Sequence, residues 1–366
     1  MSSLKLVEES EALHQRVRRF ALNAQGGFDE LALSIARFQA RHSLGLRRLL
    51  AARGKRLDTV ADIPAVPCDA FRLTRVAVHP PELDAARFVT SGTTAEARGV
   101  HAMRTTETYR ELALAFGRAA LVAQGQARRS VVALAPGPAK EPHSSLGFMM
   151  AAMMERFDGR GGSRSWLLGR AGVDIDGLRR AARLALERRE PLLVLSTAFA
   201  LVSLLEGLRQ EKIEAPPDTV VMQTGGFKGR TREIDPESLR RAVAAAFAIP
   251  PEQVIGEYGM TELTSQLYEG MLPGGRLSGP AGVYLEPPWL KLVPVDPATL
   301  LPVPDGEVGI ARIIDLGNVD SAVAIVTQDR VRRAGAGIEL LGRSPGAPPR
   351  GCSLAVEILL SDAPLA

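Results

Sequence analysis

The sequence is poor in cysteine, histidine and aromatic residues, and each shortage excludes a class of protein. Its 366 residues include two cysteines, five histidines and 5% aromatic residues. Two cysteines cannot form a disulfide framework, which leads us to expect a reducing cytoplasm. The histidines are well separated and show no zinc-binding spacing. A formal net charge of +4 is small for this length and no stripe of basic and aromatic residues occurs, so nucleic acid is not an expected partner.

Long hydrophobic runs are also missing. The longest apolar stretch covers residues 191–205, which is short of the roughly 20 residues that a membrane-spanning helix needs. A strand over residues 191–195, followed by a helix that Ser196 or Thr197 caps, is the better interpretation. The first residues lack the basic-then-apolar pattern of a secretion signal. We therefore expect a soluble protein without a stable membrane anchor.

What the sequence does contain is an alternation of strand-like and helical segments. Apolar positions recur at helical spacing over residues 4–53. From about residue 85, short apolar runs alternate with amphipathic stretches, which favours β-α-β units and a mostly parallel sheet. Beyond about residue 270, frequent glycine and proline indicate antiparallel strands and turns. The expected strand–helix pairs are 87–90 with 107–123, 130–135 with 147–154, 192–195 with 198–208, and 219–223 with 236–248. We predict an α/β protein with a helical region over 1–80, a core over 81–343 and a short segment over 344–366.

A first candidate nucleotide-binding motif follows a predicted strand. It is a run of small hydroxyl residues around a glycine, whose N–H and O–H groups can donate to phosphate oxygens. It does not have the Walker A pattern, and an ordinary turn rich in serine and threonine is the alternative. The run consists of Thr90, Ser91, Gly92, Thr93 and Thr94.

Two further strings have residue types that suit a nucleotide. In one, a Gly-Gly pair lets a flat ring lie against bare backbone and a lysine can face a phosphate, although an ordinary turn is the alternative. Its residues are Gly225, Gly226, Phe227 and Lys228. The other combines an aromatic ring for stacking, a glycine, a hydroxyl for phosphate and a carboxylate for Mg²⁺. Its residues are Glu257, Tyr258, Gly259, Met260, Thr261 and Glu262.

In this order the motifs resemble the adenylate-forming superfamily, and most closely its LuxE-type acyl-protein synthetases. The similarity lies in TSGTT, GGFKG and EYGMTELTSQLYE, and it continues in DLGN, TQD, LGR and RGCSL. It extends from about residue 55 to the end of the chain. The resemblance implies the adenylate-forming large-domain fold, with layered mostly parallel sheets, a smaller antiparallel portion and no full-size C-terminal domain. It also implies the use of ATP and Mg²⁺.

The resemblance further assigns roles to the motif residues. Glu262 would bind the metal, Asp329 would accept from the ribose hydroxyls, and Arg343 would lie near the ribose or phosphate. In isolation Asp329 and Arg343 would be surface charges. The full nucleotide-binding set is Ser91, Gly92, Thr93, Thr94, Gly225, Gly226, Phe227, Lys228, Tyr258, Gly259, Met260, Thr261, Asp329 and Arg343. Three features depart from the superfamily pattern. Ala95, Glu96, Ala97 and Arg98 follow TSGTT where a glycine and then a lysine are usual, Gln328 stands where an acidic residue is common, and the lysine of a C-terminal domain has no counterpart.

The resemblance also identifies Cys352 as the expected acyl acceptor. In LuxE-type proteins a cysteine near the C-terminus takes the acyl group and hands it to a partner reductase. Cys352 lies nine residues after Arg343, a tether that spans at most about 30 Å when extended. The alternative is a small buried hydrophobic residue on a strand. Cys68 has no such context and is expected to be structural.

His143 and Ser144 are the candidate substrate-binding residues. They precede Phe148, Met149 and Met150, which can line an acyl channel or pack in a core. A loop histidine is the alternative for His143.

We therefore predict a cytoplasmic ligase that converts a carboxylic acid, expected to be fatty, into an acyl-adenylate with ATP. The acyl group then passes to a thiol, for delivery to a partner such as an acyl reductase. One alternative is a ligase that loads an aryl or acyl group directly onto coenzyme A or a carrier-protein thiol. The other is a non-catalytic scaffold that binds a nucleotide.

Overall fold

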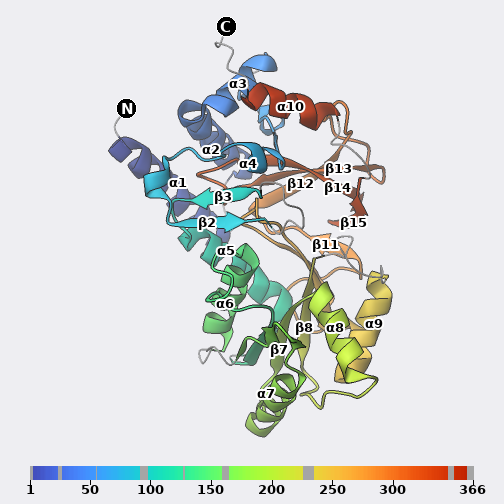
Figure 1. The fold of residues 1–366 in the computed structure, drawn as a ribbon. Helices are drawn as coiled ribbons and strands as arrows, with labels where there is room; N and C mark the ends of the chain where they lie inside the picture. The colour runs from blue at the N-terminus through green and yellow to red at the C-terminus, as the bar shows by residue number, and fades with distance from the viewer. Residues whose placement is uncertain are drawn as a thin grey trace. The chain divides into compact units, whose positions relative to one another are not determined.

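A computed structural model describes residues 3–23, 27–54, 56–90, 98–126, 128–158, 165–225, 235–344 and 350–360 (Figure 1). The chain divides into two compact units, each described here by itself. Unit 1 consists of Met1–Leu112, Met260–Ser265 and Glu286–Ala366, and unit 2 of Ala113–Gly259 and Gln266–Leu285. The three-part division at residues 80 and 343 stays a prediction.

Unit 1 begins with helices over the stretch where helical spacing predicts them. They are α1 (Ser3–Asn23), α2 (Phe28–His42) and α3 (Leu44–Ala52). The break between α2 and α3 falls at Ser43, whose side chain accepts a hydrogen bond from the Leu46 N–H and so caps α3. The apolar face of α2 includes Ile35 and Phe38, which are fully buried. The sequence pattern and the burial pattern therefore agree in this region.

The sheet of unit 1 is largely antiparallel, which confirms the prediction for the last part of the chain. Strands β12 (Leu290–Val295), β13 (Val308–Asp315), β14 (Ala324–Ala334) and β15 (Gly337–Arg343) pair in that order. The short strand β1 (Val66–Pro67) pairs in parallel with β14. This pairing brings residues near position 68 alongside a strand that lies more than 250 residues later in the chain.

One predicted β-α-β unit is wrong. Strand β2 (Ala86–Val89) pairs antiparallel with β3 (Val100–Met103), and the two form a sheet of their own. The helix α5 (Glu107–Leu121) follows β3 and does not connect two parallel strands of one sheet. Between the N-terminal helices and β3, unit 1 also contains η1 (Val60–Asp62), α4 (Ala70–Leu73) and η2 (Pro81–Leu83).

The apolar run near the C-terminus forms the helix α10 (Arg350–Leu360). The alternative that placed Cys352 on a strand is therefore wrong. Helix α10 packs against α3 and against β1. The contact with α3 is close, since a Cβ atom added at Gly45 would lie 2.8 Å from Leu359 Cδ2.

The centre of unit 2 is a parallel sheet, as the alternating pattern predicts. Strands β4 (Ser130–Leu134), β7 (Leu192–Thr197), β8 (Val220–Thr224) and β9 (Val254–Tyr258) pair side by side in that order. Two short strands, β10 (Leu267–Glu269) and β11 (Val283–Leu285), continue it beyond β9 in antiparallel fashion. The other elements of unit 2 are α6 (Ser145–Phe157), β5 (Leu168–Gly169), β6 (Gly172–Val173), α7 (Ile175–Arg188), α8 (Ala198–Leu208), α9 (Pro236–Phe247) and η4 (Pro251–Gln253).

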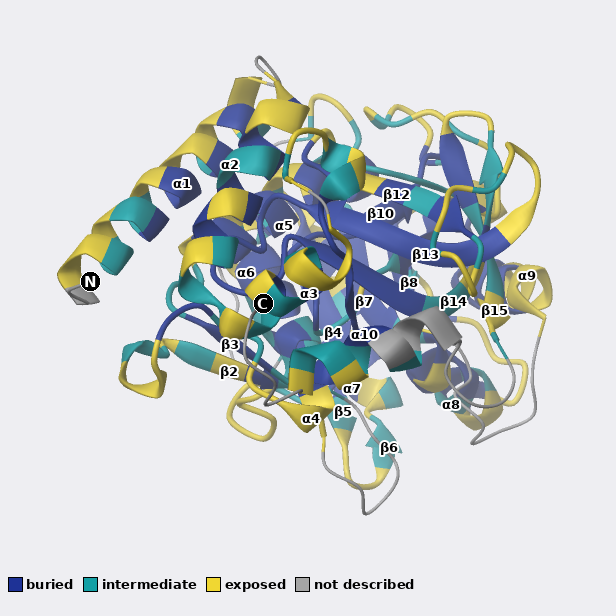
Figure 2. Ribbon diagram, turned by 90° about the horizontal axis from the view of Figure 1, so that it is seen from above, coloured by how far each residue is buried: buried dark blue, intermediate teal, exposed yellow. Residues whose placement is uncertain are grey.

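The core of unit 2 lies between this sheet and the helices α7, α8 and α9. Figure 2 shows β7 and β8 in the dark blue of buried residues. Strands with both faces covered contain continuous apolar runs instead of an alternation, which explains the sequence of β7. Of the two predicted capping residues, Ser196 and Thr197, it is Thr197 whose side chain accepts from the Ala200 N–H and begins α8. None of the helices in the described part of the chain is both long and apolar enough to cross a membrane.

Candidate functional site

Two of the sequence motifs meet at the carboxyl edge of the parallel sheet in unit 2. The register pairs Thr197 with Thr224 and Thr224 with Glu257, so β7, β8 and β9 end at the same level. Gly225 and Tyr258 therefore lie at neighbouring strand ends. Gly225 has a φ of 75°, a conformation that favours glycine. Open α/β sheets bind ligands at this edge of their strands.

A buried carboxyl group, Glu257, lies at the same edge. Its Oε2 accepts a hydrogen bond from Thr224 Oγ1, and its other oxygen packs against Gly259. A Cβ atom added at Gly259 would lie 2.5 Å from Glu257 Oε1, so an alanine there would force the buried Glu257 carboxyl group to move. Burial raises the pKa of Glu257 to about 7, although the Thr224 hydrogen bond opposes that rise. In the sequence, Glu257 begins the EYGMTE motif, but nothing there indicates a role for it.

The residues expected near the ribose lie together in unit 1. Asp329 of β14 and Arg343 of β15 are register partners, and Arg343 Nε donates to Asp329 Oδ1 at 3.2 Å. Gln328, one of the departures from the superfamily pattern, donates from Nε2 to Asp69 Oδ2 at 3.0 Å. Because β1 runs beside β14, the Cys68 N–H donates to the Val326 carbonyl at 3.0 Å. Residues 68–69 thus border the segment that contains Asp329.

Cys68, which the sequence indicated to be structural, lies beside β14, the strand that contains Asp329. The residue keeps some exposed surface, but its thiol is surrounded by protein. Burial raises the pKa of the thiol well above its ordinary value, and the carboxylates of Glu262, Asp329 and Asp69 raise it further. The Cys68 thiol is therefore kept protonated, which makes it a poor nucleophile.

The Thr261–Glu262 segment is fixed by hydrogen bonds to its carbonyl groups. His101 Nδ1 lies 2.8 Å from the Thr261 carbonyl, and Asn318 Nδ2 donates to the Glu262 carbonyl at 2.9 Å. Burial lowers the pKa of His101 to about 4, so the ring is neutral near pH 7. Since a carbonyl oxygen can only accept, the His101 proton is on Nδ1, and Nε2 accepts from Ser321 Oγ at 2.9 Å.

A buried carboxylate, Asp315, orders the chain that follows Glu262. It accepts hydrogen bonds from Thr264 N at 2.9 Å, Ser265 Oγ at 2.7 Å and Gly317 N at 2.9 Å. Burial raises the pKa of Asp315, and these hydrogen bonds oppose the rise. Asp315 is fully buried, so the loss of its carboxylate would leave several donors without a partner. In the sequence, Asp315 is notable only as the first residue of the DLGN string.

The candidate substrate residues begin α6 in unit 2. Ser144 Oγ accepts from the Gly147 N–H at 3.0 Å and caps that helix, a role that the sequence analysis did not assign. His143 is exposed in the loop before it. Met149 and Met150 are almost completely buried, which favours core packing over an acyl channel for these two side chains. Substrate binding by His143 and Ser144 stays a prediction.

Several expected site residues lie outside the described part of the chain. They are Ser91, Gly92, Thr93, Thr94, Gly226, Phe227 and Lys228. The backbone of Cys352 lies in the first turn of α10, while its side chain lies outside the description. Among the described residues, no group of three His, Cys, Asp or Glu side chains is placed to bind a metal ion. Glu262 by itself matches the requirement of Mg²⁺ for one or two carboxylates beside phosphate oxygens.

Comparison with known proteins gives one family and one fold. Residues 55–360, more than half of the chain, match a family model described as Acyl-protein synthetase, LuxE. No curated protein matches the sequence. A structure of 2-hydroxyisobutyryl-CoA ligase with 2-HIB-AMP and CoA in the thioesterification state is similar with a TM-score of 0.61 at 16% identity, over 92% of this chain and 68% of that chain. Its open conformation gives a TM-score of 0.59 at 15% identity, over 86% and 74%.

A third structure, ATP-bound MatB from Rhodopseudomonas palustris, has a TM-score of 0.48 at 18% identity, over 71% of this chain and 48% of that chain. This chain thus spans about half of the MatB chain. The similarity to the 2-hydroxyisobutyryl-CoA ligase confirms the fold that the ordered motifs predict.

Proposed function

This chain belongs to the LuxE family of acyl-protein synthetases, an AMP-forming class of ligase, and from that premise we propose that it activates a fatty acid with ATP and transfers the acyl group to Cys352. The family match over residues 55–360 is the observation that carries the proposal. It spans every motif that the sequence analysis assigned to the nucleotide and also the acceptor cysteine.

The chemistry explains why two steps are needed. A carboxylate is a poor acyl donor because an oxide ion leaves badly. In the first step a carboxylate oxygen attacks the α-phosphorus of ATP, the bond to the β-phosphate breaks, and pyrophosphate leaves. In the second step a thiolate attacks the acyl carbon, and the carbon–oxygen bond to AMP breaks as AMP leaves. Preorganised positive charge at the phosphate oxygens stabilises the first transition state.

We assign the nucleotide contacts to the residues that the motifs indicate. Gly225 and Tyr258 offer a bare backbone and an aromatic ring to adenine, and both lie at neighbouring strand ends of unit 2. The carboxylate of Asp329 is suited to accept from the ribose hydroxyls. Thr261 is assigned to the α-phosphate. Glu262 is assigned to Mg²⁺, which would supply positive charge at the phosphate oxygens.

The position of α10 supports Cys352 as the acceptor. Helix α10 packs against β1, and β1 pairs with β14, the strand that contains Asp329. The residue therefore lies on a helix that packs within the same unit as the proposed ribose carboxylate. The other cysteine, Cys68, is a weaker candidate because burial and three carboxylates keep its thiol protonated.

The test compares Cys352→Ser with the matched control Cys68→Ser. Both variants should retain acid-dependent exchange of pyrophosphate into ATP, because adenylation needs no thiol. With radiolabelled fatty acid and ATP, Cys68→Ser should become labelled as a protein, whereas Cys352→Ser should not.

Other outcomes would contradict the proposal. Label lost only in Cys68→Ser would make Cys68 the acceptor. Unchanged formation of acyl-coenzyme A by Cys352→Ser would support direct loading of coenzyme A. No exchange by the wild-type protein across a broad panel of acids would favour a non-catalytic scaffold.

A further inference from the structure

Helices α1 and α2 precede the segment that matches the family model, yet a side chain of α2 reaches into the core of unit 1. Gln39 is 1% exposed. Its Nε2 donates to the Asn318 carbonyl at 2.6 Å and the Val319 carbonyl at 2.9 Å, and its Oε1 accepts from Val323 N at 3.0 Å. These three backbone groups belong to the 316–323 loop, the segment between β13 and β14. One side chain thus satisfies all three.

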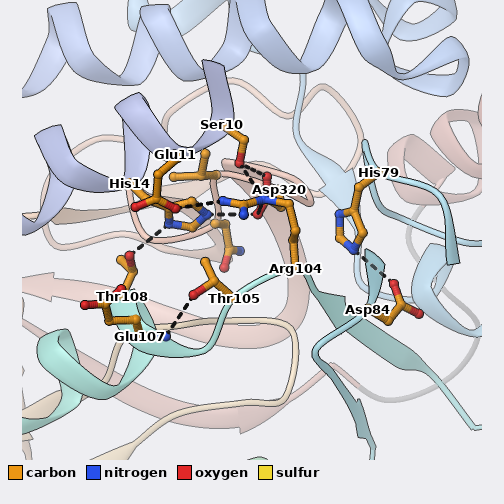
Figure 3. A network of polar contacts seen from close by, with 12 residues as sticks. Ser10, Glu11, His14, His79, Asp84, Arg104, Thr105, Glu107, Thr108 and Asp320 are labelled. Atoms are coloured by element: carbon orange, nitrogen blue, oxygen red, sulfur yellow. Dashed lines mark hydrogen bonds and ion pairs between the residues drawn. The ribbon is translucent and has the colours of Figure 1, made fainter. Parts of the chain in front are cut away.

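Helix α1 contacts the same loop. Figure 3 shows Ser10 and His14 of α1 pointing toward Asp320. His14 Nε2 lies 2.9 Å from Asp320 Oδ2, and Ser10 Oγ donates to the other oxygen of that carboxylate. Arg104 Nε lies 3.3 Å from Asp320 Oδ2 and adds a positive charge. Ser10 and His14 are four residues apart, so they share one face of α1. Both N-terminal helices therefore bind the 316–323 loop.

The loop in turn binds the Thr261–Glu262 segment. Asn318 donates to the Glu262 carbonyl, and Ser321 donates to His101, whose other ring nitrogen donates to the Thr261 carbonyl. Gln39 is hydrogen-bonded to the backbone of Asn318, the residue whose side chain contacts Glu262. Asn318 thus connects Gln39 of α2 to Glu262, the proposed metal ligand, through two hydrogen bonds.

We infer that α1 and α2 position the Thr261–Glu262 segment, with Gln39 as the main positioning residue and Asn318 as the link. The inference rests on the proposed function, in which Glu262 binds Mg²⁺ and Thr261 contacts the α-phosphate. Without the Gln39 amide, three buried backbone groups lose a partner and the 316–323 loop has to shift. A shift of about 1 Å at a positioned group can cost on the order of 100-fold in rate.

The test uses Gln39→Leu, with Ile35→Val as a matched control. Ile35 lies one turn earlier on α2 and is fully buried, and its truncation loosens the packing of α2 without removing a hydrogen bond. The first measurement is peptide-level hydrogen exchange on the protein without ligands. Gln39→Leu should speed exchange in residues 260–265 and 316–323 specifically, whereas Ile35→Val should leave these two segments as in the wild type.

The second measurement is the Mg²⁺ dependence of acid-dependent pyrophosphate exchange, well below the melting temperature of each variant. Gln39→Leu should raise the half-saturating Mg²⁺ concentration about tenfold, since changes in groups that orient a metal ligand typically weaken metal binding by about 10- to 100-fold, and Ile35→Val should not change it. Ser321→Ala removes the single hydroxyl that donates to His101 and should raise the half-saturating Mg²⁺ concentration by a smaller factor. This variant provides the test if Gln39→Leu does not fold.

The inference would be overturned if Gln39→Leu and Ser321→Ala both show the hydrogen-exchange rates of the wild type in residues 260–265 and 316–323 and the wild-type Mg²⁺ dependence of pyrophosphate exchange. That result would leave the proposed function intact. A wild-type protein without any pyrophosphate exchange would remove the proposed function, and this inference with it.

Discussion

The buried carboxyl group of Glu257 makes the stability of unit 2 depend on pH. Burial raises its pKa from 4.5 to about 7, so between these values the folded protein holds a proton that the unfolded chain has released. The free energy of unfolding should therefore be highest below pH 4.5 and should fall as pH rises through 7. Glu257→Gln keeps an oxygen that can accept from Thr224 and removes the titration.

The expected magnitude follows from the size of the pKa shift. One pKa unit corresponds to about 1.4 kcal/mol, so the Glu257 shift corresponds to about 3 kcal/mol. Relative to the wild type, Glu257→Gln should gain roughly 2.5 kcal/mol of stability from pH 5 to pH 8, because part of the wild-type loss has already occurred at pH 5. Working with the difference between the two proteins is necessary, because burial of His101 lowers its pKa to about 4 and gives the opposite trend with pH.

The assay is urea unfolding at pH 5 and pH 8, followed by tryptophan fluorescence. A Trp289→Phe background leaves Trp166 as the reporter, and Trp166 belongs to unit 2. Glu252→Gln is the control, since Glu252 is an exposed carboxylate of the same unit. A pH-independent difference between Glu257→Gln and the wild type would refute the reasoning, because it would mean that Glu257 titrates alike in the folded and unfolded chains.

Two further predictions concern the same structural features. Gly259→Ala should destabilise unit 2 by about 2 kcal/mol, because the new Cβ meets the Glu257 carboxyl group. Adding Glu257→Ala should recover part of this loss in urea unfolding. No recovery in the double variant would contradict this cause. Asp315→Ala should lower the free energy of unfolding by about 3 kcal/mol, because Thr264, Ser265 and Gly317 lose their acceptor. A loss below about 1 kcal/mol in chemical denaturation would show that these donors find other partners.

Much of the fold could be predicted because it depends on neighbouring residues. Helical spacing of apolar positions located α1 to α3, and a hydroxyl after an apolar run narrowed the start of α8 to Ser196 or Thr197, of which the structure uses Thr197. The pairing of β2 was predicted wrongly, because its strand character is local and its partner is not. A four-residue strand has the same sequence pattern in an antiparallel pair as in a parallel sheet.

In the candidate site, too, local sequence patterns indicated some residues, whereas others depend on contacts with distant segments of the chain. The resemblance placed Gly225 and Tyr258 in one nucleotide-binding set, and the structure brings them to neighbouring strand ends because parallel strands end at one edge of a sheet. The sequence indicated no role for Glu257 and only a structural one for Cys68, because what distinguishes them is burial and the charges around them. Those conditions come from other segments of the chain, such as the strand β14 that passes beside Cys68.

By itself the sequence determined most of the helices, the class of fold, the order of the motifs and the family, but not that the segment with Cys352 forms the helix α10. The tertiary structure decided which carboxyl groups lose contact with water and which backbone groups share a partner. The physical reason is range: propensity and capping act within a few residues, whereas desolvation and hydrogen bonding act between whichever atoms folding brings together. Gln39 and Val323 are 284 residues apart in the chain and share one hydrogen bond, which no local pattern in the sequence indicates.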